Sequence, residues 1–262
     1  MSLAGIWENE YGSRMTLSLA DPNLIVGKYE STTGSTGEYR VIGYQASADP
    51  TSSAGQACAL AIDWHSVVAG PPDNSWHWVS GLSGQLSLQS SGEQLVLSHA
   101  MVASVAFPGL AQAGTYIDKL IYTRVGEQHD IPAEPLPGEE VLADNPLVGS
   151  WFAQDGTALL IQSVVPYAGN AFGYVFGKLI WNGGPSLLYG VTDINAGSAG
   201  LDLQSVSIVG LPSDAGGPAI SLAGTLDLSS GVLTLLDQNS SSTAPDATYV
   251  ETTISSKTFT RQ

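Results

Sequence analysis

Four polar side chains near the N-terminus have the types and the spacing to form one binding site: Asn9, Ser13, Tyr29 and Ser31. They fall in two segments whose alternating apolar and polar residues predict adjacent β-strands. If these side chains point inward, three hydrogen-bond donors can converge on one carbonyl oxygen, as in an oxyanion hole. The competing interpretation is a set of solvated residues at the rim of a sheet, but the matching spacing of all four favours a lined cavity.

Other residues with chemical potential do not form a known catalytic or metal-binding pattern. The four histidines, His65, His77, His99 and His129, lack metal-ligand spacing, so we expect no metal and no other cofactor. Three aspartates could pair with them for proton transfer, namely Asp63, Asp118 and Asp130, yet no nucleophile motif accompanies them. A triad is therefore not expected, while a single base in a cavity stays open.

The composition limits the classes of partner. The chain has 262 residues, 43% of them hydrophobic, and a formal net charge of -16, which repels phosphate backbones and anionic lipid surfaces. We therefore expect no nucleic acid and no membrane partner. The single cysteine, Cys58, cannot form an intrachain disulfide, and the N-terminus lacks the basic and apolar regions of an export signal. Both features fit a soluble protein of the cytoplasm.

Short β-strands are the elements that must position these residues. Apolar and polar residues alternate with a period of two in MTLSLA, QLVLSHA, LDLQSVSIVG and ISLAGTLDL, and no helical period is sustained. The 30 glycines and 14 prolines divide these runs with frequent turn sequences. Short strands joined by hairpin turns predict an antiparallel meander that forms a sandwich or a barrel.

The chain repeats itself on either side of a stretch rich in proline and acidic residues. LAGIWENEYGSRMTL at 3–17 corresponds to LVGSWFAQDGTALLI at 147–161, and the two copies end on IYTR and TFTR. We therefore predict a first domain at 1–126, a linker at 127–145 and a second domain at 146–262. Shared first and last motifs indicate that these strands lie side by side, which closes a barrel. Trp7 and Trp151 recur in both copies, which favours core packing over ligand contact.

The first copy resembles the avidin and streptavidin family from about Leu3 to Arg124. The resemblance rests on five motifs: GxWxNxxGS at 5–13, GKYES at 27–31, AIDWH at 61–65, SGQL at 83–86 and IYTR at 121–124. It implies an up-and-down barrel of eight strands that holds biotin in its mouth. We therefore expect an all-β protein with two antiparallel, avidin-like, eight-stranded barrels in tandem, of which the second has diverged.

The resemblance also implies roles for individual residues. The contacts to the ureido oxygen of biotin fall on Asn9, Ser13 and Tyr29, and a contact to a ureido nitrogen falls on Ser31. Trp64 matches the first tryptophan of the hydrophobic cage, and Ser80 matches the threonine under the sulfur of the ligand. The family's aspartate aligns with Leu120, and Asp118 lies on the same strand face, where it could supply a further ureido contact.

Several positions depart from the family pattern. The second and third cage aromatics fall on Leu82 and Leu95, which widens the wall unless a register shift brings in Trp76 or Trp78. The intersubunit tryptophan aligns near Gln112, so the lid from a neighbouring subunit is expected to be missing. In the second copy the four polar positions become Ala153, Thr157, Leu179 and Trp181, so that the ureido-binding set is lost.

Two hypotheses for function follow from these residues. The first is binding of a biotin-like ligand, or another apolar molecule with a polar head group, in the first barrel. The alternative is a cofactor-free cyclase or isomerase that uses the widened cavity, with Tyr29 or Asp118 polarising the substrate. The expected partners are a small molecule and the second barrel, packed as a pseudo-dimer, with a homo-oligomer left open.

Overall fold

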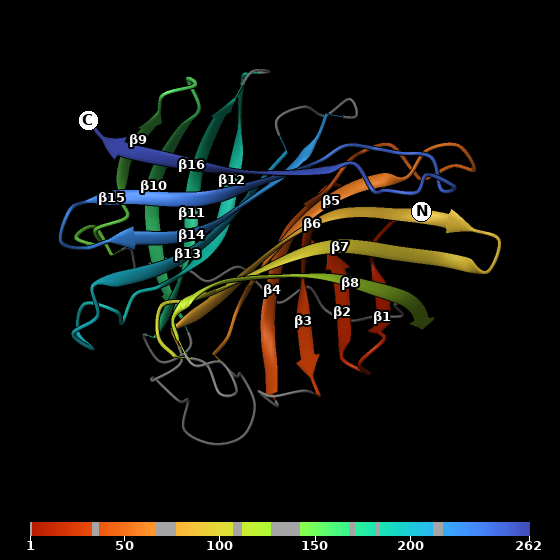
Figure 1. The fold of residues 1–262 in the computed structure, drawn as a ribbon, viewed down its shortest axis with the longest axis horizontal. Helices are drawn as coiled ribbons and strands as arrows, with labels where there is room; N and C mark the ends of the chain where they lie inside the picture. The colour runs from red at the N-terminus through yellow and green to blue at the C-terminus, as the bar shows by residue number, and fades with distance from the viewer. Residues whose placement is uncertain are drawn as a thin grey trace.

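The computed structural model describes residues 2–32, 37–65, 77–106, 112–126, 142–167, 171–181, 184–211 and 217–262. These residues form two closed antiparallel β-barrels in tandem, each of eight strands, and this confirms the expected fold class (Figure 1). Trp76 and most of the predicted linker, residues 127–141, lie outside the described residues. The described residues include no helix long and apolar enough to cross a membrane.

The first barrel is an up-and-down meander that closes between its first and last strands. β1 pairs with β2 and also with β8, where Asn9 lies opposite Tyr122. The strands are β1 (Gly5–Asn9), β2 (Arg14–Leu19), β3 (Leu24–Ser31), β4 (Gly37–Gln45), β5 (Gln56–Asp63), β6 (Trp78–Gln89), β7 (Gly92–Ala103) and β8 (Gly114–Gly126).

The second barrel repeats this topology, with β9 paired to both β10 and β16. Leu142 and Asn145, at the end of the predicted linker, contact this barrel through hydrogen bonds to Val164 and Gln204. The strands are β9 (Gly149–Ala153), β10 (Ala158–Tyr167), β11 (Phe172–Trp181), β12 (Gly184–Asp193), β13 (Leu203–Gly210), β14 (Ala219–Asp227), β15 (Val232–Ser240) and β16 (Thr252–Arg261).

The repeated glycine, tryptophan and arginine close each barrel in the same way. The Arg124 guanidinium lies over the Trp7 ring at 4.3 Å and donates to the carbonyl of Ala4 at 2.6 Å. Gly5 has a φ of 147°, and a Cβ there would lie 2.0 Å from the Arg124 guanidinium, so only glycine leaves room. Trp7 is fully buried, in agreement with a packing role. The second barrel repeats this closure with Gly149, Trp151 and Arg261.

The two barrels pack face to face through strands that are buried on both sides. Every residue of β5 is buried, because one face lines the first barrel and the other meets the second barrel. Figure 1 shows β5 and β6 running against β13 and β14. Small side chains permit this close approach: a Cβ on Gly81 would lie 2.6 Å from the Cβ of Ala223. An apolar cluster fills the interface, separate from the cores inside each barrel.

Candidate functional site

Three of the predicted polar residues meet inside one end of the first barrel. Asn9 ends β1, and its Oδ1 accepts the backbone N–H of Ser13 at 2.9 Å and of Tyr11 at 3.1 Å. These two bonds fix the β1–β2 turn, and neither uses the amide nitrogen, Nδ2, of Asn9. The side chain of Tyr29, on β3, hydrogen-bonds with Ser13 and lies beside that of Asn9. The structure thus brings Asn9, Ser13 and Tyr29 together, as the motif spacing predicts.

The environment of this cluster keeps its hydroxyl groups neutral. Burial raises the pKa of Tyr29, and the neighbouring polar side chains of Ser13, Tyr122 and Asn9 only partly oppose this effect. Ser13 is fully buried, and its Oγ lies 3.2 Å from Oγ1 of Thr32. Neutral hydroxyls can donate hydrogen bonds, so the cluster suits an uncharged or partly negative acceptor atom.

Among the described residues, two buried polar atoms of the cluster have no hydrogen-bond partner of ordinary geometry: Nδ2 of Asn9 and the hydroxyl of Tyr122. Both side chains interact with Tyr29, and Asn9 and Tyr122 lie opposite each other across β1 and β8. Burial raises the pKa of Tyr122 well above its usual value, so this hydroxyl is also neutral. A buried donor without a partner costs free energy, and a ligand atom that accepts its hydrogen bond removes this cost.

Ser31 and Trp64 extend the inward face beyond this cluster. Ser31 lies two residues after Tyr29 on β3, and therefore on the same face of the strand. Trp64 follows β5 directly, and its ring meets the ring of Tyr29 edge-on, with centroids 5.9 Å apart. The ring of Tyr39 lies 4.8 Å from that of Trp64, which adds a second aromatic contact. Trp64 thus offers an apolar wall beside the polar cluster.

Ser80 lies behind Trp64 and links it to a histidine. The Trp64 indole N–H donates to Oγ of Ser80 at 2.8 Å, and Nε2 of His99 lies 2.7 Å from the same Oγ. Burial lowers the pKa of His99 to about 4, although the Asp118 charge opposes this, so the imidazole is neutral at pH 7. Ser80 is fully buried, and its two hydrogen bonds orient the Trp64 and His99 rings relative to each other.

The two leucines at the predicted cage positions, Leu82 and Leu95, have different cross-strand neighbours. Leu82 lies opposite His99 across β6 and β7, whereas Leu95 lies between Leu86 of β6 and Tyr122 of β8 in the strand register. His99, which motif comparison missed, therefore occupies the wall next to Leu82. Trp78 is buried in the core of the first barrel.

Asp118 lies apart from the polar cluster. It is opposite His99 in the register of β7 and β8, but its side chain is exposed and accepts the N–H of Lys119 at 2.7 Å. Leu120 and Tyr122, farther along the same face of β8, are buried. The strand therefore carries Asp118 out to the rim, and the structure does not bring it together with Tyr29.

Small residual exposure shows where the inward face is open to solvent. The residues concerned are Asn9 and Leu120 at 6%, and Tyr29, Ser31, Trp64 and Met101 at 7%. Other inward-facing residues of the same barrel, such as Tyr39, Leu60 and Leu95, have 0%. Asn9 and Tyr29 of the polar cluster, together with Trp64, therefore keep a small accessible surface on the inward face.

The second barrel has a different mouth. Strand register places Asp237 where the first barrel has His99, and Lys257 where it has Leu120. Nζ of Lys257 donates to Asp155 at 2.5 Å, to Thr157 at 3.0 Å and approaches Asp237 at 3.1 Å. All three ammonium hydrogens are therefore used within the protein. Below this network the core is aliphatic and aromatic.

Within the described ranges, no group of three or more His, Cys, Asp or Glu side chains is arranged to hold a metal ion. The chemistry that the first barrel presents is hydrogen bonding by neutral donors beside an aromatic wall.

Comparison with known proteins agrees with this architecture. Residues 1–105 match the model of the Avidin family. Among curated proteins, no relative matches the chain. The family match covers the segment that carries Asn9, Ser13, Tyr29, Trp64 and Ser80, and the described strands close it into the eight-stranded antiparallel barrel expected of that family. The first barrel is therefore similar to the Avidin family over residues 1–105, and it is joined in tandem to a second, diverged barrel of the same topology.

Proposed function

We propose that the first barrel binds a small molecule whose polar head group, of the ureido type found in biotin, docks against Asn9, Ser13 and Tyr29. The observation that carries this proposal is the buried Nδ2 of Asn9, which has no hydrogen-bond partner within the described part of the chain and lies in a cluster of neutral donors. A carbonyl oxygen placed there accepts several hydrogen bonds at once in a site with little water. The family match to residues 1–105 supports the same class of ligand.

The rest of the ligand lies along the aromatic wall. Trp64 and Tyr39 form an apolar surface beside the polar cluster, where the body of the ligand packs. Ser31, on the same face as Tyr29, is the proposed partner of a ureido nitrogen. Asp118 is exposed at the rim, so any contact it makes is to a part of the ligand near solvent.

Calorimetric titration with biotin tests this proposal. Asn9→Asp keeps the Oδ1 that holds the β1–β2 turn and replaces the amide donor with an acceptor. We expect the wild type to bind biotin and the variant to bind about 100-fold more weakly, because the donor becomes a repelling oxygen. Asn23→Asp is the matched control, because its Oδ1 accepts a bond from Ser47 outside the barrel.

Equal affinity of wild type and Asn9→Asp would refute the assigned head-group site. Absence of heat from the wild type at high protein concentration would eliminate biotin as the ligand. Mass spectrometry of the ligand recovered after saturation separates binding from catalysis, since binding returns an unchanged mass.

A further inference from the structure

The second barrel holds the backbone on both sides of Trp64. Asp63, directly before Trp64, is fully buried, and its Oδ2 accepts a hydrogen bond from the Tyr167 hydroxyl at the end of β10. Its Oδ1 accepts the N–H of His65 at 3.1 Å, so one carboxylate spans Trp64 and joins it to the second barrel. The ring of His65 in turn lies 6.0 Å from the ring of Phe172.

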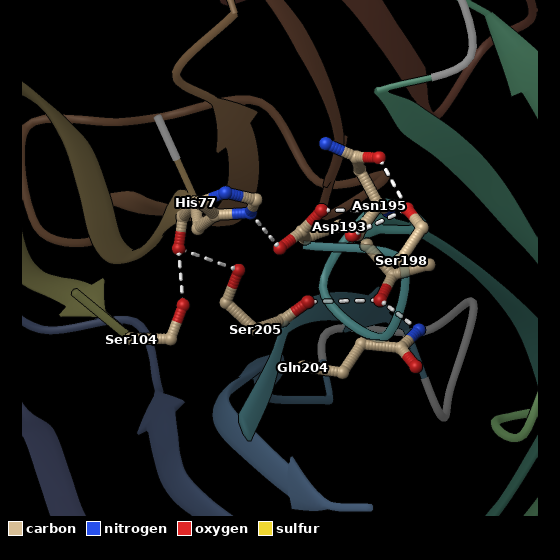
Figure 2. Close-up of polar contacts among 8 residues, drawn as sticks. His77, Ser104, Asp193, Asn195, Ser198, Gln204 and Ser205 are labelled. Atoms are coloured by element: carbon tan, nitrogen blue, oxygen red, sulfur yellow. Dashed lines mark hydrogen bonds and ion pairs between the residues drawn. The ribbon is translucent and has the colours of Figure 1, made fainter. Parts of the chain in front are cut away.

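A second anchor lies at the start of β6. Nδ1 of His77 is 2.6 Å from Oδ2 of Asp193, at the end of β12, and both side chains are buried. The carbonyl of His77 also accepts hydrogen bonds from Ser205 of the second barrel at 3.1 Å and from Ser104 at 2.6 Å. Figure 2 shows His77 held on one side by Asp193 and on the other by Ser205 and Ser104.

These anchors act on the inward face because side chains alternate along a strand. Asp63 and His65 face the second barrel, so Trp64 between them faces the interior of the first barrel. The backbone N–H of Trp64 donates to the backbone carbonyl of Trp78 at 3.1 Å, and Trp78 directly follows His77. The anchored residues Asp63 and His77 therefore directly precede Trp64 and Trp78, the two residues that this backbone bond joins.

We propose that Tyr167 and Asp193 are positioning residues for the ligand site of the first barrel, and that the second barrel serves as a built-in partner that fixes the orientation of Trp64. This inference rests on the proposed function, since it takes Trp64 as the wall against which the ligand packs. It gives the second barrel a role that does not require a ligand of its own. Neither residue touches the ligand; each acts through its bond to the first barrel.

Hydrogen exchange of the Trp64 indole N–H, followed by NMR in the full chain, tests the positioning without any ligand. The signal is identified by its loss in Trp64→Phe. Tyr167→Phe removes only the hydroxyl and keeps the ring that stacks on Tyr174 at 4.1 Å, whereas Asp193→Asn keeps the side-chain size. Thr243→Val is the matched control. It removes the 2.7 Å hydrogen bond between the barrels that Thr243 accepts from Gln85, a residue of β6 that lies away from Trp64.

We expect exchange of the Trp64 indole hydrogen to accelerate roughly 10-fold in Tyr167→Phe and in Asp193→Asn, and less than about 2-fold in Thr243→Val. Equal rates in Tyr167→Phe and the control would overturn the proposal. Biotin titration adds a second readout: where the wild type binds, Tyr167→Phe must raise the Kd more than Thr243→Val, and equal values would also overturn the proposal. Failure of the wild type to bind biotin counts against that ligand alone, because the exchange rates still decide the positioning role.

Discussion

Replacement of Asp63 by asparagine should remove a specific pH dependence of stability. Asp63 is fully buried between the barrels, and burial raises its pKa from 3.8 to about 6. The bonds from Tyr167 and from the N–H of His65, and the nearby Arg40 charge, oppose this rise, while the Asp63 charge helps to raise the pKa of Tyr39, which stays neutral. The folded state therefore holds this proton more tightly than the unfolded state.

A raised carboxyl pKa makes the folded protein more stable as the pH falls and less stable as it rises through about 6. Between pH 7 and pH 5 the wild type should gain about 1.3 kcal/mol of unfolding free energy relative to Asp63→Asn. The range ends at pH 5 because the sequence pI is near 4.2, where solubility falls.

The assay is urea denaturation of both proteins at pH 5, 6 and 7. Asp155→Asn serves as a control: the hydrogen bond from Lys257 lowers the Asp155 pKa to about 2, so this carboxyl stays ionised in both states over that range. If the difference in unfolding free energy between the wild type and Asp63→Asn were constant from pH 5 to pH 7, the reasoning would be refuted. A difference of opposite sign would mean that the hydrogen bonds to the carboxylate outweigh its desolvation.

Two further substitutions test the interface and the second barrel. Gly81→Ala would place a Cβ 2.6 Å from both Ala223 and Ser221, and should lower the free energy of unfolding, measured by urea denaturation, by about 1–3 kcal/mol. Gly114→Ala is the control and should be nearly neutral, because the atom nearest to its Cβ lies at 4.0 Å. Equal losses in the two variants would contradict close packing of the barrels at Gly81. Lys257→Met removes the cation from the mouth of the second barrel and leaves Asp237 buried without it, so stability at pH 7 should fall by about 3 kcal/mol. No loss of stability in that variant would mean that the network contributes nothing.

The barrels and the first polar cluster could be predicted because local patterns encode them. Period-two alternation defines strands, and the recurrence of Gly5, Trp7 and Arg124 in the second copy defines closure. The spacing of Asn9, Ser13 and Tyr29 places them on one inward face, and the structure brings them together. These features depend on neighbours in sequence or on an exact repeat.

The residues that sequence reasoning missed depend on register and on contacts between the barrels. His99 reaches the wall because it lies opposite Leu82, and one strand's alternation does not reveal which residue of the next strand it faces. Tyr122 lies in the IYTR motif at 121–124, which indicates barrel closure but does not indicate that the Tyr122 hydroxyl lies opposite Asn9. The bond from Tyr167 to Asp63 joins residues 104 positions apart, in barrels that resemble each other, and no local pattern marks it.

Alternation also explains the partial success with Asp118. It correctly placed Asp118 on the same face as Leu120, but it could not show where β8 leaves the covered part of the barrel. Exposure at that point depends on the length of neighbouring strands rather than on the local sequence.

The stoichiometry of biotin binding to the full chain tests the central claim most directly. Calorimetric titration should give one molecule bound per chain for the wild type and for Lys257→Met, and loss of binding in a chain that carries both Asn9→Asp and Tyr29→Phe. Two equal sites per chain, or full binding that survives in the doubly substituted chain, would contradict a single site built on the first barrel.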